Sequence, residues 1–240
     1  MGMEGVLLKQ AEEALRPYYK DAYQHAERTT QIIVQHCGIA GAAGLIPVPG
    51  GDAMVLLPSQ IVMYGRLNKV MGISISKDTG KVIGKFMLSQ ILGILASFPV
   101  AAAGAIGGSL LKFIPFFGTL AGAAVTATSY AAITYVLGIV YVKALAKAAQ
   151  SGTISETDLK SAISAEFADK DRIHDLYEQA KKNAKDMDFE RYKETAEDIE
   201  GRLGLDTTVS AVKIARGGGG VKILGEIRSR EWDDGNKILS

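Results

Sequence analysis

Two long stretches without a charged side chain lie back to back in the middle of this chain. Phe86 to Leu111 contains 26 residues and Phe113 to Val142 contains 30, and Lys112 alone separates them. As a helix, the first stretch would be about 39 Å long, whereas the hydrocarbon core of a bilayer is about 30 Å thick. The sequence therefore predicts an apolar helical hairpin that is long enough to enter or cross a membrane.

The join between the two stretches predicts a bend, because it contains Pro115 and Gly118. Gly104 and Gly108 are four residues apart, and so are Gly118 and Gly122. Small residues at this spacing let helix backbones approach closely in lipid. These four glycines therefore predict helix packing and self-association. In the alternative interpretation, Gly and Ala fill the core of a tight soluble bundle.

Lysines edge the apolar stretches but leave their join almost uncharged. Between Ala53 and Gln150 the only acid is Asp78. An acid-poor apolar region edged with lysine suits anionic lipid headgroups, and the positive-inside rule keeps both ends of the hairpin in the cytoplasm. We therefore expect a protein of the cytoplasmic membrane with cytoplasmic termini, or alternatively a cytoplasmic one. The expected headgroup contacts are Lys77, Lys81, Lys85, Lys143 and Lys147.

Composition predicts an all-α protein in four parts. Residues 1–150 have a net charge of +5, from 12 Lys and Arg against 7 Asp and Glu, and the remainder has a net charge of −4, from 15 against 19. The bases are not clustered with aromatic residues, which argues against nucleic acid as a partner. The parts are an N-terminal amphipathic helix (1–37), the apolar domain (38–150), a soluble charged helical region (151–206) and a Gly-rich linker and tail (207–240).

Local signals divide the N-terminal half further. Apolar periodicity predicts a helix over residues 4–36, which Pro17 kinks or divides. The Gly/Ala-rich segment 38–51 predicts a turn, and a second helix follows over 53–70. Asp52 is expected either to cap that helix or to organise a membrane-proximal turn. A loop is expected over 74–79. The turn residues singled out are Pro47, Pro49, Gly50, Asp52, Pro115 and Gly118.

The C-terminal part predicts soluble amphipathic helices with charged outer faces. Ser155 and Asp158 fit a capping box. Apolar residues then recur at helical spacing in three groups, the last running from Phe189 to Leu203. The tail predicts either a short β-hairpin around Gly217 to Gly220 or a flexible linker to a docking segment near Trp232.

No arrangement of residues in the sequence predicts catalysis. Gly80-Lys81 and Gly84-Lys85 lack the remaining residues of a phosphate-binding loop. His25, His36 and His174, with the single Cys37, do not have zinc-ligand spacing. We therefore expect a non-enzymatic protein without a cofactor or metal.

Two stretches of the chain carry a family resemblance. The first runs from Ala43 to Asp52 and continues through Gln60 to Gly65, and the second runs from Leu111 to Gly118 and continues to Gly138. They resemble the Pro-x-Pro-Gly-x-Asp and Ile-Pro-x-x-Gly turns of the domain-of-unknown-function 697 family, which includes YcjF-type inner-membrane proteins. The resemblance implies an all-helical fold, membrane association and a link to small GTPases. Because this chain has no GTPase motif, that GTPase would be a separate partner.

These observations together predict a protein that inserts a hairpin into the membrane from the cytoplasmic side and self-associates. Its expected partners are membrane lipids, further copies of itself and a GTPase or other protein that binds the C-terminal region. The alternative is a soluble self-assembling scaffold or shell subunit, whose apolar helices are buried in the oligomer.

Overall fold

The structure is a computed structural model that describes residues 3–17, 19–45, 51–98, 120–149, 154–202, 213–217 and 220–224. The described residues are predominantly helical, which confirms the predicted all-α class. The α-helices are α1 (Met3–Leu15), α2 (Ala22–Ala43), α3 (Gly51–Val70), α4 (Lys77–Ser97), α6 (Leu120–Ala149), α7 (Glu156–Phe167), α8 (Lys170–Asn183) and α9 (Lys193–Arg202).

The N-terminal segment forms two helices, so a single helix over 4–36 is wrong. Pro17 lies between α1 and α2, because proline lacks an N–H and its ring clashes with the preceding turn. The predicted turn is also wrong over residues 38–43, since α2 continues to Ala43. Consequently the boundary placed between residues 37 and 38 falls inside α2. Burial of this stretch outweighs the poor helix propensity of its glycines.

Helix α3 ends at Val70, as predicted, but it begins at Gly51. Asp52 is therefore the second helical residue, and its assignment as the N-cap is wrong. Gly72 follows α3 with φ of +67°, a left-handed conformation that glycine adopts without penalty. The predicted loop is shorter than expected, because α4 already begins at Lys77. Its N-cap is Ser76, whose side chain accepts a hydrogen bond of 3.1 Å from the Thr79 amide.

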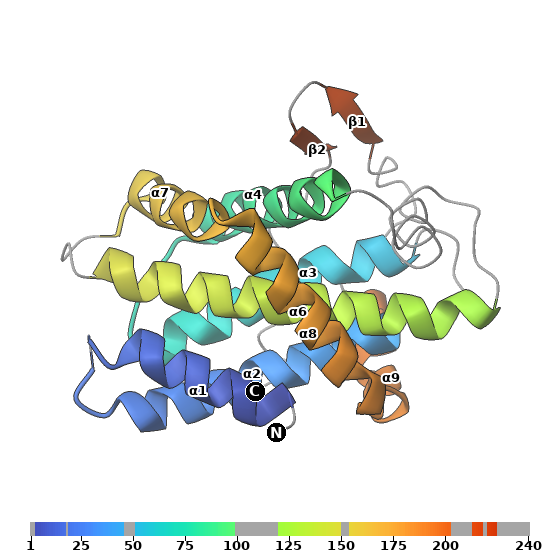
Figure 1. The fold of residues 1–240 in the computed structure, drawn as a ribbon, viewed down its shortest axis with the longest axis horizontal. Coiled ribbons are helices and arrows are strands. Elements are labelled where there is room, and N and C mark those ends of the chain that lie inside the picture. The colour runs from blue at the N-terminus through green and yellow to red at the C-terminus, as the bar shows by residue number, and fades with distance from the viewer. Residues whose placement is uncertain are drawn as a thin grey trace.

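Helix α6 runs through the middle of the bundle (Figure 1). Helices α1 and α2 lie on one side of it, α4 and α7 lie on the other, and α8 crosses it obliquely. Helices α4 and α6 run in opposite directions, which agrees with the antiparallel hairpin expected from the sequence. However, α4 contacts α3, α7 and α8 as well as α6, so the pair is embedded in a larger bundle.

The C-terminal helices are partly as predicted. Ser155 caps α7 and accepts a hydrogen bond of 3.1 Å from the Asp158 amide, which confirms the predicted N-cap. The Asp158 carboxylate in turn accepts a hydrogen bond from the Ser155 hydroxyl. The first two apolar groups form the buried faces of α7 and α8. A third helix over the whole of 189–203 is wrong, because two 3₁₀ turns, η3 (Ala184–Asp186) and η4 (Glu190–Tyr192), precede α9.

The described part of the tail is a β-hairpin. Strand β1 (Lys213–Gly217) pairs antiparallel with β2 (Gly220–Leu224), with Lys213 opposite Leu224 and Gly217 opposite Gly220. Strand β2 lies against α4.

Candidate functional site

The most apolar helix of the described chain is enclosed by the other helices. Residues Thr126–Ala148 of α6 are long and apolar enough to cross a membrane, and no other helix in the described ranges passes that test. Yet 94% of the most apolar 18-residue window in this span is buried. Helices α1, α2, α3, α4, α7 and α8 all contact α6. Within the structure, therefore, neighbouring protein surrounds this helix, as it surrounds the core helix of many soluble proteins.

Helix α6 packs against both α2 and α3, and specific contacts define the directions of these three helices. Residue 138 of α6 lies against Ile33 of α2, and Ala127 lies against Gly44. The two helices are therefore antiparallel. Helix α3 is parallel to α6, since its residues 60 and 68 bond to Thr134 and Tyr141 respectively. These contacts fix the register of the core.

Glycines permit the close approach of α2 and α6. A Cβ atom at Gly138 would lie 2.8 Å from Cγ1 of Ile33, and one at Gly44 would lie 2.9 Å from the backbone N and Cα of Ala127. Neither position has room for a larger side chain without movement of a neighbour. Sequence reasoning had assigned helix packing to other glycines at a four-residue spacing and had missed these, because their partners are about a hundred residues away.

Two further glycines of α2 lie under aromatic rings from the C-terminal region. A Cβ atom at Gly38 would overlap the ring of Tyr192, and one at Gly41 would overlap the ring of Phe189. Their three-residue spacing places both glycines on the same face of α2. This face therefore receives two rings that a helix with ordinary side chains would exclude.

The glycines and turn residues chosen from the sequence lie mostly outside the described residues. Gly122 and Asp52 fall within α6 and α3 respectively, and their backbones are helical. The remainder lie outside the description, namely Pro47, Pro49, Gly50, Gly104, Gly108, Pro115 and Gly118.

The predicted headgroup lysines occupy α4 and the last turns of α6. Lys147 is exposed, and Lys85 is partly buried. Lys81 Nζ lies 3.9 Å from Oδ1 of Asp78. Burial lowers the pKa of Lys143, and the nearby Arg172 lowers it further, against the opposing effect of two carboxylates. Lys77 is the first residue of α4, and its side chain lies outside the description.

A buried polar cluster joins α2 to α3. Nδ1 of His36 lies 3.1 Å from Oγ of Ser59, and both residues are fully buried. Nε2 of His36 lies 3.4 Å from Arg66, whose guanidinium also donates a hydrogen bond of 2.8 Å to Oε1 of Gln35. Burial, and then the charge of Arg66, lower the pKa of His36 to about 3. The imidazole is therefore neutral at physiological pH.

This serine–histidine pair has the opposite environment from a catalytic one. A catalytic triad places a carboxylate behind the imidazole, where it stabilises the imidazolium that forms during reaction. Here the guanidinium of Arg66 occupies the corresponding side of His36 and opposes protonation. Both partners are also shielded from substrate by burial. The cluster instead satisfies buried polar groups and specifies how α2 packs on α3.

Two hydrogen bonds between side chains join α3 to α6. Gln60 Nε2 donates a hydrogen bond of 2.7 Å to Oγ1 of Thr134, and Tyr141 OH donates one of 2.9 Å to Oδ1 of Asn68. The rings of Tyr64 and Tyr141 lie 4.3 Å apart. Burial raises the pKa of both tyrosines.

Tyr64 OH and Gln60 Oε1 are buried without a hydrogen-bond partner. Such groups are costly, so they mark positions where the packing of α3 is not optimised for stability.

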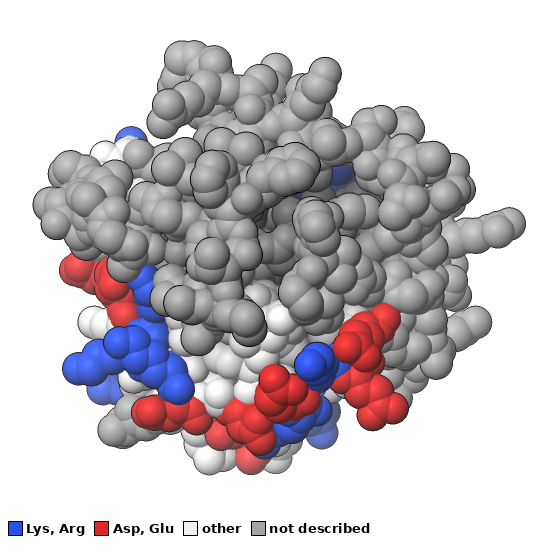
Figure 2. Space-filling model, turned by 90° about the vertical axis from the view of Figure 1, so that its right-hand side faces the viewer, with Lys and Arg blue, Asp and Glu red and all other residues white. Residues whose placement is uncertain are grey.

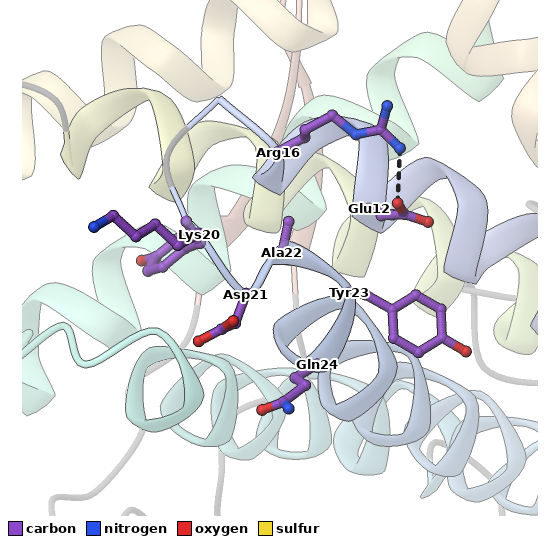
Figure 3. A pocket seen from close by; sticks show the side chains of 8 residues that line it. Glu12, Arg16, Lys20, Asp21, Ala22, Tyr23 and Gln24 are labelled. Atoms are coloured by element: carbon purple, nitrogen blue, oxygen red, sulfur yellow. Dashed lines mark hydrogen bonds and ion pairs between the residues drawn. The ribbon is translucent and has the colours of Figure 1, made fainter.

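A shallow depression of about 570 Å³ lies at the turn between α1 and α2. Figure 3 shows its lining, where Arg16 donates a hydrogen bond of 2.7 Å to Glu12. The depression is open to solvent, and its charges have mixed sign. Among the described residues there is no group of histidine, cysteine or carboxylate side chains that could hold a metal ion. The depression is lined by Glu12, Arg16, Tyr19, Lys20, Asp21, Ala22, Tyr23 and Gln24.

The charges on one end of the molecule also have mixed sign. Figure 2 shows Lys and Arg side chains beside Asp and Glu side chains over the described part of that face. A nucleic-acid surface is expected to gather positive charge, and the described residues of this face do not.

No protein-family model, curated protein or solved structure matches this chain. The resemblance to the domain-of-unknown-function 697 family therefore stays a prediction, and the enclosed α6 with its two polar interfaces is the feature from which a function is inferred.

Proposed function

We propose that this chain is a non-enzymatic, membrane-inserting helical bundle. In water it keeps α6 enclosed, and at a cytoplasmic membrane surface the bundle opens and exchanges the protein neighbours of α6 for lipid. The helices after residue 154 remain in water and present a charged surface to partners, among which a separate GTPase is the one that the family resemblance implies. Exposed apolar helices would also associate with those of further copies.

The observation that carries this proposal is the combination of length and composition in α6. Thr126–Ala148 contains 23 residues, which corresponds to about 35 Å of helix and exceeds the roughly 30 Å of hydrocarbon in a bilayer. A helix on the surface of a soluble bundle needs only one apolar stripe. The apolar residues of this helix are distributed around it and not confined to one stripe. It also runs antiparallel to α4, so the two could leave the bundle as a hairpin.

The enclosure of α6 also supports a second candidate function. If lipid never replaces the surrounding helices, the same contacts describe the core of a soluble scaffold protein. The hydrophobic effect does not distinguish these two environments, because removal of apolar surface from water is favourable in either case.

A reversible cross-link between α2 and α6 tests the proposal. Ile33 and residue 138 lie side by side, so the double variant Ile33→Cys and Gly138→Cys places two thiols within reach of a disulfide. The native Cys37 is replaced by alanine to prevent mispairing. The oxidised and reduced forms of this one protein are then compared by flotation with vesicles of phosphatidylcholine and phosphatidylglycerol, followed by a carbonate wash. The single variant Cys37→Ala under the same oxidising conditions is the control.

We expect carbonate-resistant flotation of the reduced protein and its loss in the oxidised protein. Equal resistant flotation of both forms would show that insertion does not require separation of α2 from α6, and would overturn the opening step. Absence of flotation in both forms, together with a defined particle mass by light scattering, would favour the scaffold.

A further inference from the structure

We propose that the segment Ala184–Arg202, hereafter the latch, is a displaceable clasp that holds α2 against α6 and whose release opens the bundle. The latch comprises η3, η4 and α9. Its role in membrane entry depends on the proposed function, whereas its role in closing the bundle is carried by the contacts below.

The latch bridges the three central helices. Turn η3 contacts α6, η4 contacts α2, and α9 contacts both α2 and α3. Its two aromatic rings, Phe189 and Tyr192, lie over Gly41 and Gly38 of α2. A short segment therefore ties together the helices that must separate if α6 is to leave the bundle.

The latch lies where opening would begin. Residue 44, just after α2, packs against Ala127 near the start of α6, and the latch covers α2 only three and six residues earlier. Residues 99–119, whose only charged side chain is Lys112, lead directly into α6 at the same end. In Figure 1, α9 lies at the lower right, near the beginning of α6. Release of the latch would thus free the end of α6 that is joined to the predicted hairpin tip.

The latch is weakly attached compared with the helices it covers. Among its residues with described side chains, the buried ones are Ala184, Phe189 and Ala196. The ion pair between Lys193 and Glu190 is 3.6 Å long and exposed, and exposed pairs contribute little. Short 3₁₀ turns also supply fewer and poorer hydrogen bonds than an α-helix. Segments with few buried contacts are those that open locally while the remainder stays folded.

The single cysteine provides a reporter for this motion. Cys37 is fully buried in α2. It lies one turn after Ile33, which contacts residue 138 of α6, so both residues are on the face of α2 that packs against α6. The latch rings lie over Gly38 and Gly41, which are one and four residues from Cys37. Labelling of Cys37 by a chromogenic disulfide reagent therefore measures exposure of the face of α2 that α6 and the latch cover.

Two variants release the latch by different routes. Phe189→Ala removes a ring, and Gly41→Ala places a methyl group where that ring lies while improving the helix propensity of α2. The matched control for the second is Gly93→Ala in α4, where a Cβ atom meets nothing within 4 Å. The control for the first is Ile163→Ala, a truncation of a fully buried residue of α7 that tests general destabilisation. All variants are made in the chain of 240 residues, and circular dichroism verifies their helix content.

We expect both latch variants to raise the labelling rate of Cys37 by about tenfold or more, in proportion to the open population. Tryptic cleavage at Lys185 and Arg191 should rise in parallel, while both controls stay near wild type. Faster cleavage with unchanged labelling would show that the segment is a peripheral cover, and would overturn the latch. Equal labelling in Ile163→Ala and Phe189→Ala would overturn it as well.

Vesicle flotation of the same variants separates the latch from the proposed function. Faster labelling together with stronger flotation supports both inferences. Faster labelling without flotation of any variant supports the latch and contradicts membrane insertion. Equal flotation of all variants despite faster labelling contradicts the role of the latch in membrane entry and leaves insertion itself supported.

Discussion

Acid should loosen the interface between α2 and α3 through a single residue, His36. Its imidazole is fully buried beside Arg66 and holds a pKa of about 3, against an ordinary value of 6.5. The unfolded chain therefore binds a proton at a pH where the folded chain does not. The contribution of His36 to the free energy of unfolding is therefore fully present above about pH 6.5 and is lost as the pH falls toward 3.

The size of the effect follows from the two pKa values. Each unit of difference corresponds to about 1.4 kcal/mol, so the contribution of His36 to the free energy of unfolding falls by about 2 kcal/mol at pH 5 and by about 3 kcal/mol at pH 4. Small domains have a total stability of about 5–15 kcal/mol. The predicted loss is therefore large enough to measure.

Urea unfolding of wild type and His36→Gln, followed by far-ultraviolet circular dichroism at pH 7.5, 6, 5 and 4, measures this contribution. Glutamine cannot titrate and retains a polar group for Ser59, and subtraction of the two curves removes the effect of every other titrating residue. We expect the stability difference between the two proteins to shift in favour of the variant by about 2 kcal/mol between pH 7.5 and pH 5. Parallel curves across that range would refute the reasoning.

Two further predictions concern side chains with matched controls. Tyr141→Phe leaves Asn68 Oδ1 without its 2.9 Å hydrogen bond and should cost about 1–3 kcal/mol, whereas Tyr64→Phe removes a hydroxyl that has no partner and should be neutral or stabilising. Urea midpoints test this pair, and an equal loss in both variants would contradict it. Ser155→Ala removes the cap of α7 and should cost about 1 kcal/mol, while Ser155→Asp should retain most of that stability. If Ser155→Asp has the same melting temperature as Ser155→Ala, the result would count against capping by residue 155.

The helical class and several element boundaries could be predicted from local chemistry. Pro17 interrupts the first helical pattern, Ser155 begins α7, and the apolar faces of α7 and α8 recur at helical spacing. The predicted boundaries at Gly38 and Asp52 differ from those of α2 and α3, because glycine is a turn signal in sequence but is helical at these positions. In α2 the glycines are helical because they lie under rings and against a neighbouring helix, and a sequence window contains neither partner.

The candidate site could be predicted only in part. The exceptional apolar length of α6 was evident, because 30 uncharged residues are visible without any structure. The polar interfaces were not, since Gln60 and Thr134 are 74 residues apart in sequence and Tyr141 and Asn68 are 73 apart. The sequence shows only that His36 lacks zinc-ligand spacing, whereas its significance lies in the partly buried guanidinium of Arg66 beside it.

The sequence alone determined that this chain is helical and that its centre must be removed from water, because periodicity, capping and charge are local properties. Only the tertiary structure decided what surrounds α6 in the described protein, namely six neighbouring helices. Hydrophobic burial is non-directional and does not specify which surface covers an apolar helix. The choice of neighbour depends on shape, on glycines that admit a ring or a backbone, and on hydrogen bonds between residues far apart in the chain.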